Sequence, residues 1–168
     1  MENMKNIILI SLLIFISSNS YGKTKLIKKF KTWNAYSSTI EKKKTCFIAS
    51  EPIKFEGDYK KENRGKTYVF VTNTKGVSSH EVSVVAGFNY KKNSDVFFTI
   101  DGNKTKMFPI EDRAWSASSN VDRNLVRLMK KGNKLVVTGT SSPGNLIKDT
   151  FSLSGFTKAL AIIDKNCS

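Results

Sequence analysis

One histidine and two neighbouring serines are the residues of this 168-residue chain that could carry out nucleophilic chemistry. His80 could act as a general base for the hydroxyl of Ser141 or Ser142, with Asp149 orienting the imidazole, as in a serine hydrolase. The sequence contains no GxSxG, HExxH or Gly-rich phosphate-binding motif. A solvent-facing His80 at a strand edge and a turn at the two serines before Pro143 form the competing interpretation. The hydrolase therefore stays an alternative hypothesis.

Acidic residues occur in two short groups that could bind a cation or transfer protons. Glu111 and Asp112 could pair for acid–base catalysis or hold a cation, and a solvated turn is the alternative. The segment 101–104 (Asp-Gly-Asn-Lys) begins like a calcium-binding loop, but the Asp-x-Asp-x-Asp-Gly ligand series is absent. Asp-Gly is instead a strong hairpin-turn signal. We predict no metal site and no cofactor.

The first 22 residues have the three-part layout of a secretory signal peptide. Lys5 precedes the apolar block 7–16, and small polar residues follow that block. The block is roughly half the length of about 20 residues that a membrane-spanning helix needs. Small residues allow cleavage after Ser20 or after Gly22. We predict that residues 1–22 are removed on export, which leaves no transmembrane span.

The two cysteines of the chain, Cys46 and Cys167, lie 121 positions apart. With no CxxC motif and a single histidine, Cys and His cannot supply a four-ligand zinc site. An even number of cysteines in an exported chain is typical of disulfide bonding. We therefore predict a Cys46–Cys167 disulfide that ties the last helix to an early strand.

Short segments with an apolar period of two dominate the rest of the chain, which is 39% hydrophobic and has 11 Phe and 3 Pro. This pattern excludes wholesale disorder and predicts a mainly β fold, a single-domain antiparallel sandwich or barrel. We expect the β-rich domain over 44–168, preceded by a basic N-terminal arm and first strand over 23–43, with a loose Lys-rich stretch over 21–30. The predicted strands are 44–50, 67–72, 81–88, 95–100, 104–108, 134–140 and 149–153.

Two segments follow a helical period instead. Ser119 and Asp122 form an Asp variant of the capping box and predict the start of a helix that ends before Gly132. A second helix is predicted to begin after Ser154 or Gly155. The apolar faces of the two helices are Val121, Leu125, Val126, Leu128 and Met129, and Phe156, Ala159, Leu160, Ile162 and Ile163.

The chain is strongly basic, with 28 Lys and Arg against 14 Asp and Glu, a net charge of +14. Twenty-four of the basic residues are lysines, and dedicated phosphate or base readers prefer the forked guanidinium of arginine, so nucleic-acid binding ranks third. Trp115 could be an exposed anchor for a partner or a core residue beneath the first helix. The candidate interaction surface comprises Trp115, Arg113, Lys91, Lys92, Lys130 and Lys131.

A series of short motifs runs through the chain from Trp33 to Cys167. In order, these are Trp33, a K-x-C-x-x-x-S-x-P segment over 44–52, Glu81-Val82-Ser83, 86–90, Ile100-Asp101-Gly102, Ala114-Trp115, 125–132, 139–144, 149–156 and Cys167. Together they resemble the invasion-associated locus B family of exported bacterial proteins. The resemblance implies a small β-rich domain of the periplasm or outer membrane, without known catalytic residues.

The main functional hypothesis is a non-enzymatic periplasmic or envelope-associated module with a cationic surface. Its partners would be anionic envelope components, such as lipid headgroups and lipopolysaccharide, or an unknown envelope protein. The alternatives are the hydrolase that uses Ser141 or Ser142 with His80 and, third, a nucleic-acid binder.

Overall fold

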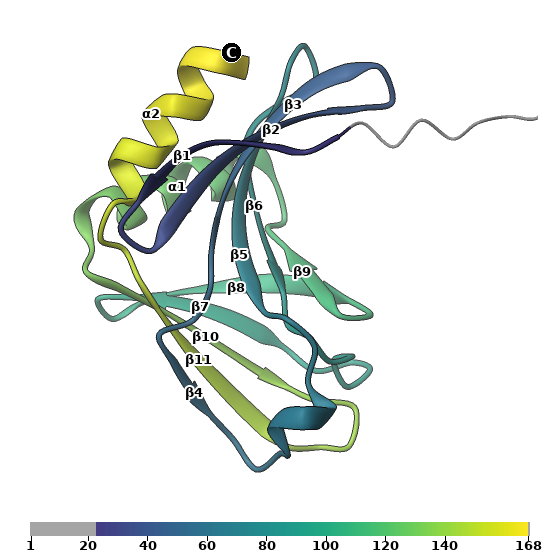
Figure 1. Cartoon of the computed structure of the whole chain (residues 1–168). Helices are drawn as coiled ribbons and strands as arrows, with labels where there is room; N and C mark the ends of the chain where they lie inside the picture. The colour runs from purple at the N-terminus through teal and green to yellow at the C-terminus, as the bar shows by residue number, and fades with distance from the viewer. Residues whose placement is uncertain (1–22, 168) are drawn as a thin grey trace, which may run out of the picture.

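The computed structural model describes residues 23–167, so the predicted signal peptide lies outside the described residues. The described chain is mainly β, with eleven strands in one antiparallel sheet and two α-helices (Figure 1). This confirms the predicted fold class, although the sheet is open and not closed into a barrel. The strands are β1 (Lys25–Phe30), β2 (Trp33–Ile40), β3 (Lys43–Ser50), β4 (Lys54–Glu56), β5 (Tyr68–Thr74), β6 (Ser78–Val85), β7 (Val96–Ile100), β8 (Asn103–Ile110), β9 (Arg113–Trp115), β10 (Lys134–Thr140) and β11 (Leu146–Ser152), in the spatial order β1-β2-β3-β5-β6-β9-β8-β7-β10-β11-β4.

The sheet turns at β8, which is shared between two groups of strands. The first five residues of β8 pair with β7, whereas Phe108 to Ile110 pair with β9. The strands on either side of β8 therefore lie at an angle to each other, as Figure 1 shows. Both groups contribute buried side chains to one core cluster, for example Val71 from β5, Phe98 from β7 and Leu135 from β10. The arrangement is that of a sandwich whose two halves are joined by a corner strand.

Two helices cover the first group of strands. Helix α2 (Phe156–Cys167) packs on β1, β2, β3 and β5, and α1 (Ser119–Lys131) packs on β6 and on α2. Trp33 at the start of β2 is fully buried and meets Phe156 edge to face, with ring centroids 5.0 Å apart. Its indole Nε1 donates a hydrogen bond to the carbonyl of Ser152, at 3.0 Å. One aromatic residue thus joins β2, the end of β11 and the start of α2.

The N-terminal Lys-rich stretch is a strand and not a loose arm. Residues 25–30 form β1, which pairs with β2 and so extends the same sheet. The prediction of a loose stretch over 21–30 was wrong. The four lysines of this stretch do not occupy every second position, because a bulge between Leu26 and Lys28 disrupts the strand period of two. The short strands β4 and β9 were not predicted either, since three residues carry too little periodicity.

Both predicted helices are confirmed, but the capping box is wrong. The N-cap of α1 is Ser118, whose side chain accepts a hydrogen bond from the amide of Val121. Asp122 is buried and turns toward β6, where its Oδ1 accepts hydrogen bonds from the amide of Val82 at 2.8 Å and the hydroxyl of Ser116 at 2.6 Å. Strand β9 pairs with only the last three residues of β6. Asp122 therefore satisfies an edge amide that no strand covers.

Gly132 ends α1 for a steric reason. Its backbone is extended, with φ of −82°, and not the left-handed conformation expected of a glycine after a helix. A Cβ atom at this position would lie 2.6 Å from Cγ2 of Ile100. Glycine is therefore required so that the end of α1 can approach the β7–β8 turn.

The predicted disulfide is confirmed. Cys46 on β3 is bonded to Cys167, which is the last residue of α2 and not a residue beyond it. We expect the Cys46→Ser/Cys167→Ser variant to lose about 2–5 kcal/mol of unfolding free energy, because the bond joins residues 121 positions apart in sequence. Urea denaturation measures the loss. Wild-type protein in reductant should match the variant, and equal stability of the oxidised and reduced proteins would contradict the prediction.

We expect Asp122→Ala to destabilise the protein by about 1–3 kcal/mol, because the amide of Val82 and the hydroxyl of Ser116 lose their acceptor. Ser119→Ala is the control and should change the unfolding free energy by less than about 0.5 kcal/mol, the range of ordinary surface substitutions. Similar losses in the two variants would support the capping box instead.

Candidate interaction surface

Strands β8 and β9 form a hairpin around the turn Glu111-Asp112. The cross-strand pairs are Phe108 with Trp115 and Ile110 with Arg113. Ala114 lies between the two pairs and is fully buried, so side chains of the pairs point to the opposite, outer face. Phe108 is 50% exposed and Ile110 is 63% exposed. Apolar side chains of this size at such exposure are available for contact with another molecule.

Lys91 and Lys92 lie next to this hairpin. The amide of Tyr90 donates to the carbonyl of Glu111 at 2.8 Å, and both lysines line a shallow cavity of about 260 Å³ together with Pro109 and Glu111. Four of the six predicted surface residues, Arg113, Trp115, Lys91 and Lys92, therefore lie on or next to the hairpin, although the two lysines adjoin Pro109 and Glu111 and not Arg113 or Trp115. We define the hairpin patch as Phe108, Ile110, Arg113, Trp115, Lys91 and Lys92.

The remaining two residues of the predicted surface, Lys130 and Lys131, lie at the other end of β8. They end α1 just before Gly132, which contacts Ile100 and Asp101 in the β7–β8 turn. The eight residues of β8 separate this turn from the hairpin patch, a distance of about 26 Å. The six residues do not form one surface.

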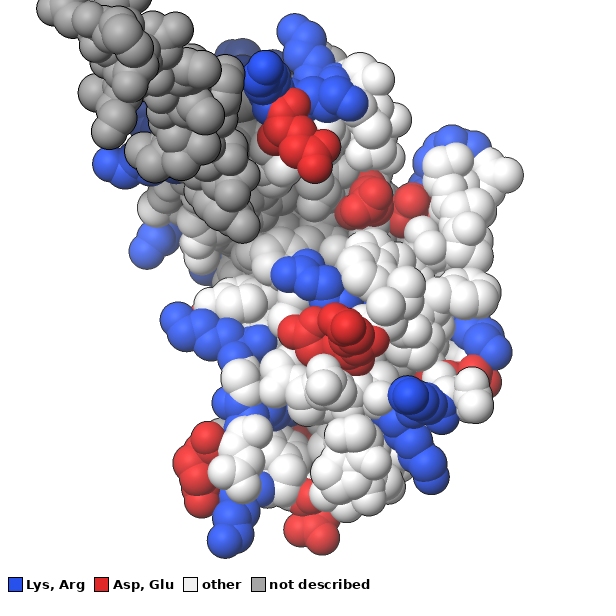
Figure 2. Space-filling view, turned by 90° about the vertical axis from the view of Figure 1, so that its right-hand side faces the viewer, with Lys and Arg blue, Asp and Glu red and all other residues white. Residues whose placement is uncertain are grey.

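Positive charge on the outer side of the molecule is divided among several groups. Figure 2 shows blue side chains in separate clusters, with acidic and uncharged side chains between them. The turn residues Glu111 and Asp112 place two carboxylates beside the three basic residues of the hairpin patch. It is a mixed apolar and charged surface.

Trp115 is half-buried, so it is neither the fully exposed anchor nor the core residue that the two interpretations of the sequence described. The core position in β9 belongs to Ala114. Trp115 pairs across the sheet with Ser83 of β6, which in turn pairs with Phe70 of β5. The outer face therefore continues from the hairpin patch into a row of aromatic side chains.

This aromatic row was not identified from the sequence. Phe47 contacts Tyr36 and Phe70 with ring centroids 5.1 and 5.9 Å apart, and Tyr68 contacts Phe70 at 5.7 Å. The hydroxyl of Tyr68 donates to Glu51 at 2.7 Å, and this bond raises the pKa of Tyr68 to about 12. The alternation of aromatic residues with Val69 and Val71 in β5 is the signal that could have revealed the row.

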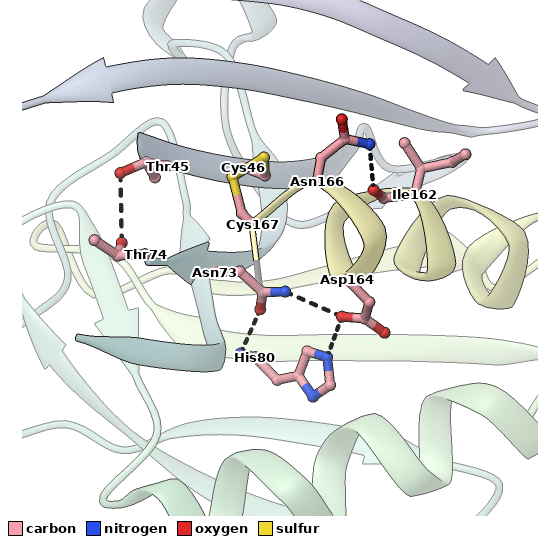
Figure 3. The surroundings of a disulfide bond; sticks show 9 residues. All are labelled: Thr45, Cys46, Asn73, Thr74, His80, Ile162, Asp164, Asn166 and Cys167. Carbon is pink, nitrogen blue, oxygen red and sulfur yellow. Dashed lines mark hydrogen bonds and ion pairs between the residues drawn. A yellow bond between two sulfur atoms is a disulfide. The ribbon is translucent and has the colours of Figure 1, made fainter. Parts of the chain in front are cut away.

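The catalytic trio considered from the sequence is not assembled, because Ser141, His80 and Asp149 each have another partner. Ser142 lies in the same turn as Ser141, and its amide donates to the carbonyl of Asn89 at 2.8 Å. Ser141 Oγ accepts from the amide of Asn145 at 3.2 Å and donates to its carbonyl at 3.3 Å, which confirms a turn-forming role. Asp149 pairs with Arg64, and His80 pairs with Asp164 of α2. Figure 3 shows His80 next to Asn73 and Asp164, in the surroundings of the disulfide bond.

His80 belongs to a structural cluster and is not a solvent-facing edge residue (Figure 3). It lies where the β5–β6 register shifts, and its φ of 60° is left-handed. Its Nε2 is 2.7 Å from Oδ1 of Asp164, and its amide donates to Oδ1 of the buried Asn73 at 2.7 Å. Asn73 Nδ2 also donates to Asp164 at 3.0 Å. The cluster and the Cys167 disulfide together attach the end of α2 to β3, β5 and β6.

Arg64 and Asp149 form a buried ion pair between the loop before β5 and strand β11. Two bonds of 2.9 and 2.5 Å join the guanidinium to both carboxylate oxygens. Arg64 also donates to the carbonyl of Ala86 and to the hydroxyl of Tyr59. Burial raises the pKa of Asp149 and the guanidinium opposes that rise. Three aromatic rings, of Phe55, Tyr59 and Phe88, lie 5.1–5.2 Å from the guanidinium carbon.

A cavity of about 330 Å³ lies beside this ion pair. Arg64 contributes to its wall, but its guanidinium is held by the contacts to Asp149, Tyr59 and Ala86. The ion pair is therefore a structural element at the cavity wall. The other lining residues are Tyr59, Lys60, Asn63, Phe88, Ser141, Pro143, Asn145 and Ile147.

Comparison with known families decides the classification. The sequence profile described as invasion associated locus B (IalB) protein matches residues 33–164, most of the chain. The chain belongs to the invasion-associated locus B family. Comparisons with curated proteins and with solved structures gave no match.

The match to the invasion-associated locus B profile begins at Trp33, the residue that joins β2 to α2, and ends at Asp164 in the polar cluster. It therefore contains the hairpin patch and the buried Arg64–Asp149 pair. Strand β1 and Cys167 lie just outside it. The family profile thus includes β2, which was placed before the predicted domain start at residue 44.

In the part of this family member that the structure describes, no group of three or more His, Cys, Asp or Glu side chains is positioned to hold a metal ion. Glu111 and Asp112 form the two-residue turn of the hairpin, in agreement with the solvated-turn interpretation. Asp101 and Gly102 form the β7–β8 turn, with positive φ at both residues.

Among the described helices, neither combines the length and hydropathy needed to span a bilayer.

We expect Arg64→Met to reduce the unfolding free energy by about 3–5 kcal/mol, because Asp149 is left as an unpaired buried carboxylate. The double variant Arg64→Met/Asp149→Leu should recover a large part of that loss. Urea denaturation of the single and double variants measures both values. Purely additive losses would show that the two side chains do not interact.

Proposed function

We propose that this protein is an exported, non-enzymatic module of the cell envelope, whose positive charge holds it against anionic envelope components. Lipid headgroups and lipopolysaccharide phosphates are the polyanions of that compartment. The observation that carries the proposal is the lack of internal neutralisation. Among the side chains that the structure describes, which exclude that of Lys61, ion pairs involve three lysines, Lys54, Lys106 and Lys148. The excess of positive charge therefore faces solvent and can act on a partner.

The engagement of the polar residues supports a binding role over catalysis. His80, Ser141 and Asp149 each stabilise a local structure and do not lie in one cleft. The invasion-associated locus B family is also not a known enzyme family. A name that refers to invasion is not carried over to this chain as a phenotype, since a shared fold does not transmit one.

Export is supported by the disulfide and by the sequence before β1. Disulfides persist in oxidising compartments such as the periplasm and are rare in the cytosol. The predicted signal peptide over 1–22 would direct the chain there, with cleavage after Ser20 or Gly22. Trp115, Arg113, Lys91 and Lys92 stay part of this proposal as a mixed contact surface, and Lys130 and Lys131 add to the overall charge.

We expect binding to immobilised lipopolysaccharide to weaken at least tenfold between 50 mM and 0.5 M NaCl. The distance over which exposed charges attract each other, the Debye length, is about 8 Å at physiological ionic strength and becomes shorter as the salt concentration rises. Pull-down or surface plasmon resonance with mature, oxidised protein measures the change. A neutral glycan matrix is the control and should retain little protein at either salt concentration. Binding that is unchanged by salt would rule out the electrostatic attachment.

A further inference from the structure

Three turns and chain segments meet at one end of the first group of strands. The start of β1 lies beside the end of β2, since Lys25 pairs with Ser37. The β2–β3 turn follows, and the amide of Lys75 in the β5–β6 turn donates to the carbonyl of Lys44 at 3.0 Å. Residues separated by up to 50 positions in sequence thus share one end of the sheet (Figure 1).

This end carries a high density of positive charge. Six exposed lysines occur in the three segments, with Glu41 as the acidic residue among them. Within residues 23–167, no ion pair involves any of the six. The upper part of Figure 2 shows blue basic side chains at this end, with red acidic side chains beside them. The lysines are Lys23, Lys25, Lys42, Lys43, Lys44 and Lys75.

Apolar side chains project from the same segments. Ile40 is 54% exposed, Val77 is 60% exposed and Leu26 is 42% exposed. Ile40 directly precedes the tight turn Glu41-Lys42, where both residues have left-handed φ, and its side chain contributes nothing to the buried core. Single exposed apolar residues are ordinary, but three of them among six unpaired lysines form an amphipathic surface. We call these nine residues the sheet-end patch.

We propose that the sheet-end patch is a docking surface for an anionic lipid bilayer. The lysines contact headgroup phosphates, and Ile40 and Val77 enter the boundary between headgroups and acyl chains. Juxtaposed basic and apolar side chains are the combination that holds peripheral proteins on anionic membranes. This inference rests on the proposed envelope function and names its partner and surface.

Two observations favour this end of the molecule over the hairpin patch. The hairpin patch places Glu111 and Asp112 beside three basic residues, whereas the sheet-end patch has one acid for six lysines. Lys23 of the sheet-end patch also directly follows, in sequence, the predicted signal peptide over 1–22 with its apolar block 7–16. Before cleavage, a membrane-inserted signal peptide would hold this same end near the bilayer.

Flotation with lipid vesicles tests the proposal, using vesicles of phosphatidylcholine alone or with phosphatidylglycerol. Wild-type protein should float with the anionic vesicles and not with the neutral ones. Lys42→Glu/Lys43→Glu should weaken binding to anionic vesicles at least tenfold. Lys130→Glu/Lys131→Glu makes the same change in net charge at a distant site and should weaken it less than about threefold. Equal losses in the two double variants would overturn the assignment of the surface.

The apolar contribution has its own matched pair. Ile40→Ser/Val77→Ser should weaken binding to anionic vesicles about fivefold or more, because two inserted side chains are lost. Ile53→Ser/Leu146→Ser replaces two apolar residues that are 53% and 67% exposed and lie outside both patches, and it should bind like wild type. Thermal unfolding confirms that all four variants are folded. If the two apolar variants bind equally, Ile40 and Val77 do not enter the bilayer.

The outcomes separate this inference from the proposed function. Salt-sensitive binding to lipopolysaccharide without flotation on anionic vesicles would overturn lipid docking and leave the envelope function in place. No binding to either polyanion would overturn both.

Discussion

The attachment of α2 across the inner face of the first strands is the constraint on which the rest of the structure depends. At the start of the helix, Phe156 packs against the buried Trp33, and at its end Cys167 is bonded to Cys46. These two contacts fix both ends of a short helix on β2 and β3. Because the helix closes the inner face, apolar side chains that alternate toward the other face remain uncovered. The aromatic row on β2, β3 and β5 is a consequence of that arrangement.

The open sheet and its irregular strand ends also explain why several polar side chains are engaged in structural hydrogen bonds and ion pairs. Asp122 accepts the edge amide of β6 that β9 does not reach, and Asn73 accepts the amide of His80 at a bulge. Arg64 and Asp149 join the loop before β5 to strand β11 under three aromatic rings. Buried backbone groups and charges must find partners, so these side chains are structurally committed.

The lysines contrast with these committed residues. Most lie in turns and along the edge strand β1, where a charged side chain stays solvated and protects an open sheet edge from pairing with another chain. The fold then concentrates some of them, because turns that are distant in sequence share one end of a sheet. The same lysines can therefore protect the sheet edge from pairing and contact a membrane.

Periodicity and composition determined the β-rich class, the two helices and the disulfide partners, and the order of short motifs from Trp33 to Cys167 indicated the family. Each of these depends on the spacing of nearby residues or on the presence of only two cysteines, and both can be read directly from the sequence. The sequence did not reveal that Lys91 and Lys92 lie next to the β8–β9 hairpin while Lys130 and Lys131 lie at the other end of β8. It also did not reveal that Asp122 accepts a hydrogen bond from β6 and does not form a cap. Strand order, the corner at β8 and the meeting of three turns decided those outcomes. They are set by packing between segments far apart along the chain, and no local pattern of residue types encodes such distances.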